Sequence, residues 1–375
     1  MSAIRPDFAL RPAGTISGGG GGASISTGLI VDNAAIITPA GFLACDGSLV
    51  SRTTFAALFS AIGVAYGAGD GSTTFALPSK RAIISTITPN TVMPVGAPYK
   101  LTLLLDGRIL AVGGNSAYIG TFSSTGAITW VASTAYPTNI QYGNLHILSD
   151  GRVLYIAGVV ASTAVAACYF GTISGNTITW VLGTALPATR NNFASMILQD
   201  GRILVVAGGS TYFGTNQNTT YFGTISGNTI TWVAGTAYPQ TIRELSGILL
   251  PDGSVLCTGG YTSSAQTVCY RGVISGNTIT WTATENLPEI KSGHDTFLLP
   301  TNQILAISGN RGGSNYTLNI AIGHRSNTSV LWATDPVPAP VAISYYGSCM
   351  SGNRLILVNS ATVYVIQFVI PVIKT

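Results

Sequence analysis

A repeat of roughly 50 residues runs through the C-terminal three-quarters of the chain and limits the folds that are open to it. Its clearest copy, Tyr-Phe-Gly-Thr-Ile-Ser-Gly-Asn-Thr-Ile-Thr-Trp, ends at Trp232. The same words end at Trp180 and, slightly altered, at Trp281, and degenerate copies end at Trp130 and Trp332. Such a period is typical of radial or stacked arrays of one supersecondary unit.

Each unit also contains a second phrase, in which Asp-Gly separates two apolar runs. The phrase occurs at Asp106-Gly107, Asp150-Gly151, Asp200-Gly201 and Asp252-Gly253, with weaker forms at Thr301-Asn302 and Ser351-Gly352. Asp-Gly favours a tight hairpin in which both central residues take positive φ, and Gly227-Asn228 suits the other hairpin in the same way. Two hairpins give four short strands, a to d, because apolar residues alternate with Thr and Tyr.

The phrase Ile-Leu-Val-Val-Ala-Gly208-Gly209, with a later Trp, resembles kelch-type and galactose-oxidase-like propeller blades. The double Gly recurs at Gly113-Gly114 and Gly259-Gly260. Six a–b hairpins accompany only five d strands with Trp, so the missing d strand lies ahead of the first unit. We therefore predict a mainly β chain with a six-bladed propeller of four-stranded blades, whose last blade is closed by residues 82–89.

Residues 36–80 form a different unit. They contain Pro39-Ala-Gly41-Phe42-Leu-Ala-Cys45-Asp46-Gly47, Ser51-Arg52, Leu58-Phe59, Ile62-Gly63, Tyr66-Gly67 and Gly69-Asp70-Gly71-Ser72-Thr-Thr-Phe75-Ala-Leu77-Pro78. The pattern predicts a short strand and then a helix capped near Ser51 and ended by Gly63. Its apolar face comprises Phe55, Leu58, Phe59 and Ile62.

This stretch closely resembles the phage tail collar domain. The resemblance implies a small α+β domain in a tail or fibre component, attached to the virion and forming a homotrimer. The family usually continues into an Arg-Gly-Arg-like segment, whereas Lys80-Arg81 leads here straight into the predicted closing strand. We expect three parts: an extended Gly-rich arm at 1–30, the collar domain at 31–80 and the propeller at 81–375.

Composition excludes several other classes of protein. The net charge of +4 is modest and the basic residues are scattered, so we expect no nucleic-acid binding. The apolar residues come in strand-length bursts, none of them long enough to span a membrane. The five cysteines show neither paired nor zinc-binding spacing, which favours free thiols and synthesis in the host cytoplasm. We expect no metal and no cofactor.

Candidates for catalysis are few. Six of the thirteen acidic residues lie in predicted turns, and no pair among the other seven recurs in a glycosidase-like local pattern. The three histidines are scattered, unlike the ligands of a galactose-oxidase copper site. His146 lies in an apolar strand, where we expect it to pack in the core. His294-Asp295 is the one pair that resembles a catalytic dyad, and its alternative interpretation is a polar loop contact. We therefore predict no catalytic residues and no enzyme activity.

The loops indicate where a partner binds. In a four-stranded blade the short a–b and c–d turns share one face, while the longer b–c and d–a connections share the other. Long, irregular loops on a rigid scaffold commonly carry recognition. The candidate receptor-binding residues there are Tyr142, Arg190, Asn191, Asn192, Tyr212, Arg243, Glu244, Tyr261, Lys291, His294, Asp295, Arg311, Tyr345 and Tyr346. An alternative for the cations is that they only satisfy loop carbonyls.

The sequence thus favours a bacteriophage virion protein of the tail fibre or tail tip. The arm and collar would bind other tail or baseplate proteins, and the propeller would bind a host-surface glycan or protein during adsorption. Two alternatives stay open: a propeller enzyme that acts on host surface glycan, and a purely structural tail component that never touches the host.

Overall fold

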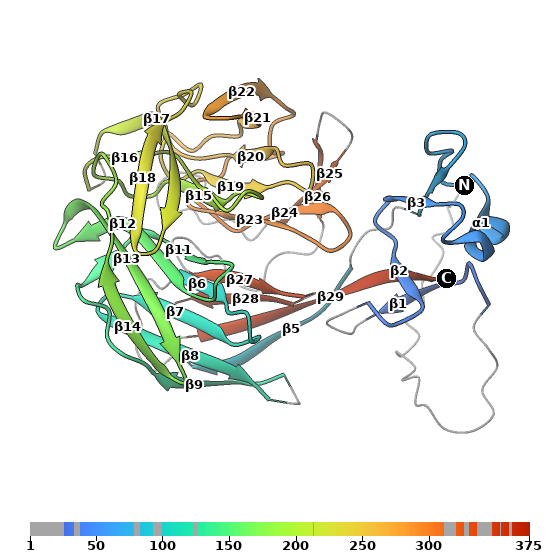
Figure 1. The fold of residues 1–375 in the computed structure, drawn as a ribbon, viewed down its shortest axis with the longest axis horizontal. Coiled ribbons are helices and arrows are strands. Elements are labelled where there is room, and N and C mark those ends of the chain that lie inside the picture. The colour runs from blue at the N-terminus through green and yellow to red at the C-terminus, as the bar shows by residue number, and fades with distance from the viewer. Residues whose placement is uncertain are drawn as a thin grey trace, which may run out of the picture.

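The computed structural model describes residues 26–33, 38–78, 83–92, 100–123, 126–212, 214–310, 320–325, 330–335, 347–352, 354–359 and 362–375. Short antiparallel sheets dominate these residues, and α1 (Ala56–Ile62) is the one helix in them. Figure 1 shows the sheets grouped together, with a smaller unit beside them.

The smaller unit contains the predicted collar. It consists of α1 together with β1 (Ile30–Asn33), β2 (Phe42–Ala44), β3 (Leu49–Ser51) and β4 (Thr74–Ala76). The helix turns Leu58 into the core, and Phe55, Phe59 and Ile62 pack against that core, which confirms the predicted apolar face. Gly63 ends the helix with φ 54° and donates its N–H to the Phe59 carbonyl. Ser51 Oγ accepts the N–H groups of Thr53 and Thr54, ahead of the helix proper.

The repeats fold as antiparallel sheets, of which four have four strands in chain order and the second has five strands. The first sheet contains β6 (Lys100–Leu103), β7 (Ile109–Gly113), β8 (Ser116–Phe122) and β9 (Ile128–Ala132). The second contains β10 (Ile140–Gln141), β11 (Asn144–Ile147), β12 (Val153–Val160), β13 (Thr163–Ser174) and β14 (Thr177–Leu182), where β10 and β11 both pair with β12. The third contains β15 (Ala194–Ile197), β16 (Ile203–Gly209), β17 (Asn216–Ser226) and β18 (Thr229–Ala234).

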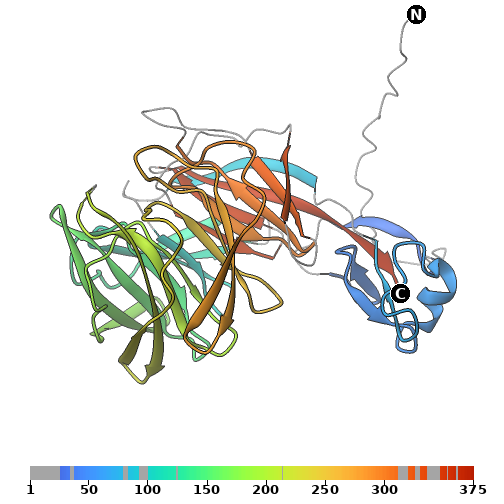
Figure 2. The same ribbon diagram turned by 90° about the horizontal axis from the view of Figure 1, so that it is seen from above.

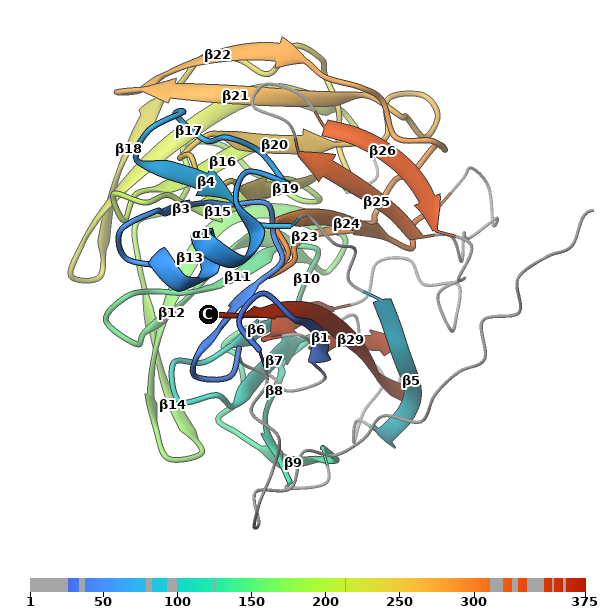
Figure 3. The ribbon, with the colours of Figure 1, turned by 90° about the vertical axis from the view of Figure 1, so that its right-hand side faces the viewer.

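Two further sheets follow the same plan. The fourth contains β19 (Ser246–Leu249), β20 (Val255–Thr258), β21 (Cys269–Ser275) and β22 (Thr278–Ala283). The fifth contains β23 (Asp295–Leu298), β24 (Gln303–Ile307), β25 (Ile320–Arg325) and β26 (Val330–Asp335). Figure 3 shows these sheets side by side around a common centre.

The last sheet joins the two halves of the sequence. It contains β27 (Ser348–Ser351), β28 (Arg354–Asn359), β29 (Thr362–Lys374) and, from before the first repeat, β5 (Ile83–Val92). β5 pairs antiparallel with β29, with Thr88 opposite Val365 and Ile84 opposite Phe368. This is the pairing that the sequence predicted for residues 82–89.

β29 belongs to both parts of the molecule. Its first residues pair with β28 and β5, whereas Ile370 to Lys374 pair with β1 and β2 of the collar. Figures 1 and 2 show this strand running from the sheets into the smaller unit. Ile373 is fully buried in the collar core beside Leu58 and Phe75. The C-terminal end of the segment 81–375, which the sequence assigned to the propeller, therefore completes the collar.

Apolar clusters hold consecutive sheets together. Each cluster takes side chains from two neighbouring sheets, as where Ile119 of the first sheet meets Tyr155 of the second. Equivalent clusters join the second to the third sheet, the third to the fourth, the fourth to the fifth and the fifth to the last. One more cluster joins the last sheet to the first, with Ile356 and Val365 against Ile109 and Tyr118. Within the described residues, every sheet thus has a partner on both faces.

The repeated turns also link neighbouring sheets. Arg152 forms an ion pair with Asp150 in its own turn, and its Nη1 donates to the Gly227 carbonyl and to Asn228 Oδ1 of the next sheet (both 2.7 Å). Arg108 and Arg202 make the same contacts one sheet earlier and one sheet later. The Asp-Gly-Arg and Gly-Asn phrases recur together because each holds the other across a sheet boundary.

The turn types differ from the sequence prediction. In the Asp150-Gly151 hairpin only the glycine has positive φ (85°), and the Gly151 N–H donates to the Leu148 carbonyl, as in a type I turn followed by a left-handed glycine. In the Gly175-Asn176 hairpin again only the glycine has positive φ (57°), which is the type II′ pattern. Both turns therefore need one glycine and leave the polar neighbour free to make side-chain contacts.

The tryptophan of each repeat packs beside a glycine of the neighbouring strand. Gly223 in β17 lies opposite Trp232 in β18, and a Cβ at Gly223 would lie 2.6 Å from the Trp232 ring. The indole N–H points to the Thr184 carbonyl of the preceding sheet (3.4 Å), whose hydroxyl oxygen accepts the Ile230 N–H. The Phe-Gly-Thr-Ile and Thr-Ile-Thr-Trp phrases recur together because the glycine of the first packs against the tryptophan of the second.

We predict that Ile373→Ala destabilises the collar selectively. Removal of this buried side chain leaves a cavity in a small core, which typically costs about 2–5 kcal/mol of unfolding free energy. Hydrogen exchange measured by mass spectrometry should show faster exchange in residues 42–77 and unchanged exchange in β16 and β17. Ile290→Ala, at an exposed position, is the matched control. Wild-type protection of the collar in Ile373→Ala would contradict the assignment of β29 to that core.

Candidate functional site

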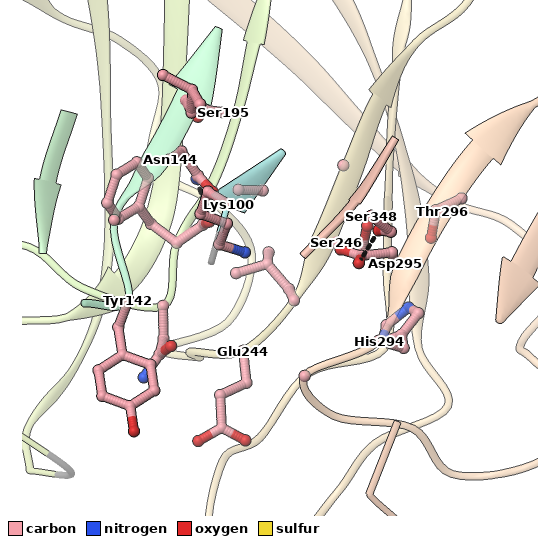
Figure 4. Close-up of a pocket in the computed structure, with 18 of the residues that line it drawn as sticks. Lys100, Tyr142, Asn144, Ser195, Glu244, Ser246, His294, Asp295, Thr296 and Ser348 are labelled. Carbon is pink, nitrogen blue, oxygen red and sulfur yellow. Dashed lines mark hydrogen bonds between the residues drawn. The ribbon is translucent and has the colours of Figure 1, made fainter. Parts of the chain in front are cut away.

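The first strands of the sheets surround a cavity of about 230 Å³. β6, β11, β15, β19, β23 and β27 each contribute residues at or near their first positions. The lining is largely polar, as Figure 4 shows. The polar side chains are those of Lys100, Tyr142, Asn144, His146, Asn192, Ser195, Glu244, Ser246, His294, Asp295, Thr296 and Ser348.

Four equivalent residues form the mouth of this cavity. Tyr142, Asn192, Glu244 and Gly293 each lie two residues before the first position of the innermost strand, and all have φ between 49° and 59°. Their backbones are linked in sequence: Asn192 N–H donates to the Tyr142 carbonyl (2.9 Å), Glu244 N–H to Asn192 (2.7 Å) and Gly293 N–H to Glu244 (2.9 Å). Three non-glycine residues in a left-handed conformation are uncommon, and this chain of hydrogen bonds holds them there.

Glycines at the end of strand b donate hydrogen bonds to the connections that carry the mouth residues. Gly158 N–H donates to the Arg190 carbonyl, Gly208 N–H to Ile242 and Gly260 N–H to Lys291 (each 2.8 Å), always across a sheet boundary. A β-bulge precedes Gly158 and Gly208, because the pairing shifts there. The bulge turns an amide away from its own sheet and toward the next sheet's connection.

The side chains at the mouth differ from one another. Glu244 Oε1 accepts Arg243 Nε (3.1 Å), and its carboxylate lines the cavity although only 3% of the side chain is exposed. The Tyr142 ring lies 6.0 Å from that of Tyr212, which comes from the loop between β16 and β17 and is 37% exposed. Arg243 covers the Tyr261 ring at 4.5 Å and donates to Asn216 Oδ1 (2.9 Å).

The next layer is formed by the first residues of the innermost strands. Asp295 Oδ2 accepts the hydroxyl of Ser348, which joins the fifth sheet to the last, and Asn144 Nδ2 donates to the Phe193 carbonyl (2.8 Å). Ser246 and Lys100 also border the space (Figure 4). The cavity therefore offers carboxylate, ammonium, amide and hydroxyl groups within one small volume.

The two histidines near the cavity are hydrogen-bonded and neutral. His146 Nε2 shares a hydrogen bond with Ser195 Oγ (2.7 Å), and His294 Nε2 shares one with Thr258 Oγ1 (2.8 Å). Burial lowers the pKa of His146 to about 4, with a smaller contribution from the positive charge of Lys100. Burial likewise lowers the pKa of His294 to about 3, aided by the charge of Lys291.

His294 and Asp295 do not form the catalytic-type pair that the sequence raised. In the part of the chain that the structure describes, the His294 ring is hydrogen-bonded to Thr258, and the Asp295 carboxylate accepts the hydroxyl of Ser348. Successive residues of a strand point to opposite faces, so adjacent positions separate the two groups. The alternative interpretation, polar contacts within the scaffold, fits both residues.

Three of the candidate contact residues lie inside the protein and not on its surface. Arg190 is 1% exposed, and Asn191 and Lys291 are fully buried, so none presents its side chain to a partner. Lys291 Nζ donates to Glu289 Oε1 (2.7 Å) and to the Ser308 carbonyl (3.1 Å), and burial lowers its pKa to about 7. Arg190 donates to Thr219 Oγ1, and burial lowers its pKa also. The charged side chains of Arg190 and Lys291, which the sequence suggested were available to a partner, instead bind groups of the connections between sheets.

The remaining candidates divide into two groups. Tyr142, Asn192, Glu244, His294 and Asp295 line the cavity, and Tyr212, Arg243 and Tyr261 adjoin it. Arg311, Tyr345 and Tyr346 lie outside the described residues.

The sequence missed Lys100, Asn144, Ser195, Ser246, Thr296 and Ser348 as site residues, and it placed His146 in the core alone. The signal was present in the repeat. Once the units are aligned by strand pairing, one equivalent position, the first of strand a, carries Lys100, Asn144, Ala194, Ser246 and Asp295.

The described residues offer few side chains for metal binding or for thiol reactions. Within the described ranges, no three His, Cys, Asp or Glu side chains gather as a metal-ion site. All five cysteines are buried, and none of them forms a disulfide. Burial raises the pKa of Cys168, Cys269 and Cys349 to about 12, which keeps these thiols protonated.

The collar lies on the side of the sheets away from the cavity mouth. β29 is strand c of its sheet, so it leaves the sheets at the side of the c–d turns and enters the collar there. The mouth residues come from connections between sheets, which reach the opposite side. Figure 1 shows the collar at the right and the b–c hairpin of β12 and β13 at the left.

Comparisons with known proteins support both halves of this description. Residues 28–84 match the family model of the Phage Tail Collar Domain. This match spans the segment predicted from sequence and points to a protein of the phage tail-fibre type. No curated protein matches the chain.

Solved structures resemble the sheet-containing part. The structure of YjhT is similar with a TM-score of 0.61 and 12% identity, over 75% of this chain and 96% of that one. A fungal alcohol oxidase of the AA5 family, in complex with copper, is similar with a TM-score of 0.53 and 11% identity, over 78% of this chain and 77% of that one. At these identities the likeness shows the fold alone: a propeller-like arrangement of the kelch and galactose-oxidase type. Among the described residues, no helix has the length and apolar character needed to cross a membrane.

We predict that acid destabilises the protein through its buried histidines. Because the folded-state pKa of His294 is lowered from 6.5 to about 3, the unfolded state binds more protons below pH 6.5. The contribution to stability is present above pH 6.5 and declines by about 3 kcal/mol toward pH 4. Urea unfolding of wild type and His294→Gln between pH 4 and 7.5 should show a weaker decline in the variant. Parallel pH profiles would contradict this assignment.

Proposed function

We propose that the chain is a bacteriophage tail-fibre or tail-tip protein that binds a host-surface molecule at the loop side of its propeller. The N-terminal arm and the collar attach it to other tail proteins, and the propeller binds a glycan or protein of the host during adsorption. The observation that carries the proposal is the position of the collar, which leaves the cavity mouth on the side that points away from the attachment.

The proposal includes the architecture that supports the loops. The described sheets form a closed, six-bladed propeller, in which β5 supplies strand d of the last blade. Pairing of β5 with β29 and the apolar cluster between the last and first sheets support the closure. A closed ring gives a rigid support for variable loops, because no sheet face is left without a neighbour.

The proposal also covers the location and the oligomeric state of the protein in the virion. The mature protein is part of the phage tail, assembles after synthesis in the host cytoplasm, and acts by binding without converting its target. The collar resemblance supports a homotrimer. Sedimentation equilibrium of the full chain tests this directly, and a purely monomeric chain at micromolar concentration would remove the trimer from the proposal.

We predict that Tyr212→Ala weakens binding to host cells. Tyr212 is exposed at the mouth beside Tyr142, and an aromatic side chain at the centre of an interface typically contributes about 2 kcal/mol or more. Fluorescently labelled full chain should bind host cells about tenfold less tightly in the variant.

Tyr66→Ala is the matched control, because Tyr66 is an exposed tyrosine of the collar. It should leave cell binding unchanged. Equal loss in both variants, or no loss in either with wild-type folding, would place the host contact elsewhere.

A further inference from the structure

Internal comparison of the repeats separates framework positions from cavity positions. The turns and the tryptophan contact repeat almost unchanged, since Asp150 and Asp200, or Trp180 and Trp232, make the same bonds in successive sheets. The first position of the innermost strand does not repeat. In the first five sheets it carries Lys100, Asn144, Ala194, Ser246 and Asp295. The repeated turns and tryptophan contacts show that the units share one framework, within which this cavity position varies.

The charged groups of the cavity keep unused hydrogen-bonding capacity. Glu244 Oε1 accepts Arg243, whereas its Oε2 accepts no hydrogen bond from the described residues. Asp295 accepts one hydroxyl through Oδ2. Lys100 Nζ makes neither an ion pair nor a hydrogen bond in the part of the chain described here, yet it is near enough to His146 to lower the pKa of that ring. A ligand can therefore use two acceptors and one strong donor.

Size and charge limit the kind of ligand. About 230 Å³ is smaller than the usual range for drug-sized ligands and suits a single six-membered ring. The charges of Lys100 and Arg243 balance those of Glu244 and Asp295, so the site favours a ligand without net charge. Hydroxyl groups both donate and accept, and the Tyr142 ring offers an apolar surface at the rim.

We propose that the cavity binds one neutral sugar residue, the exposed terminal unit of a host-surface glycan. The sugar hydroxyls donate to Glu244 Oε2 and Asp295 and accept from Lys100, while Ser246 and Asn144 border the ring. This inference rests on the proposed receptor-binding function and narrows its ligand class from glycan or protein to a neutral sugar.

The test is binding of individual methyl glycosides to the full chain. Saturation-transfer NMR is run with methyl glycosides of glucose, galactose, mannose and N-acetylglucosamine, together with methyl glucuronide and a blocked trialanine peptide. At least one neutral glycoside should bind, with a Kd of about 1 mM. Glu244→Gln should raise this Kd about tenfold or more, because a hydrogen bond to a carboxylate is lost.

Glu285→Gln is the matched control, since Glu285 is exposed and does not line the cavity. It should leave the Kd unchanged, and thermal unfolding confirms that both variants are folded. The proposal is overturned if no neutral glycoside binds, if Glu244→Gln binds as wild type does, or if the glucuronide or the peptide binds more tightly. Cell binding that depends on Tyr212 without any glycoside binding would overturn the sugar site and leave the receptor-binding function standing.

Discussion

Each four-stranded sheet of this protein is apolar on both faces and must be covered on both sides. Ile109 and Leu110 are adjacent in β7, are both fully buried, and belong to clusters on opposite sides of one sheet. A linear stack of such sheets would expose an apolar face at each end. An apolar cluster joins the last sheet to the first, and its side chains come from β27, β28 and β29 and from the first repeat. The rest of the architecture follows from this requirement.

The same requirement places the collar. β5 and β29 pair in the last sheet, and the collar is continuous with both: β5 follows it in sequence, and β29 runs into it. Two neighbouring strands therefore connect the collar to the propeller-like part, at the side of the c–d turns. A strand shared by two cores transmits orientation better than a flexible linker does, because its backbone is hydrogen-bonded on both sides of the junction.

Polar groups between the sheets have two different roles. Lys291 helps to fix a connection between sheets, and it is buried and bonded to Glu289 and to the Ser308 carbonyl. Where polar groups surround the cavity, they are bonded only in part, as Glu244 is. The residues that hold the loops and the residues that a ligand can reach are neighbours in sequence, so composition alone cannot distinguish them.

Much of the fold was predictable from sequence, because short-range signals dictate it. The tryptophan period, the Asp-Gly turns and the apolar face of α1 each depend on neighbours within a few residues, and the d strand at 82–89 followed from a missing member of a regular series. The turn types were predicted less well, since Asp-Gly and Gly-Asn suit more than one hairpin geometry. The candidate site was predicted only in part: three of the four mouth residues, Tyr142, Asn192 and Glu244, were among the candidates. Arg190, Asn191 and Lys291 were assigned to a surface that they do not reach.

The sequence by itself determined that the chain is a repeating β protein with a collar domain, because those features depend on local pattern. Tertiary structure alone decided which polar side chains meet. Lys100, Glu244 and Asp295 are far apart in the chain and come together only because successive sheets place their first strands around one centre. Tertiary structure also decided that the last residues belong to the collar, since Ile373 has no local partner and is buried only through strands from the other end of the chain.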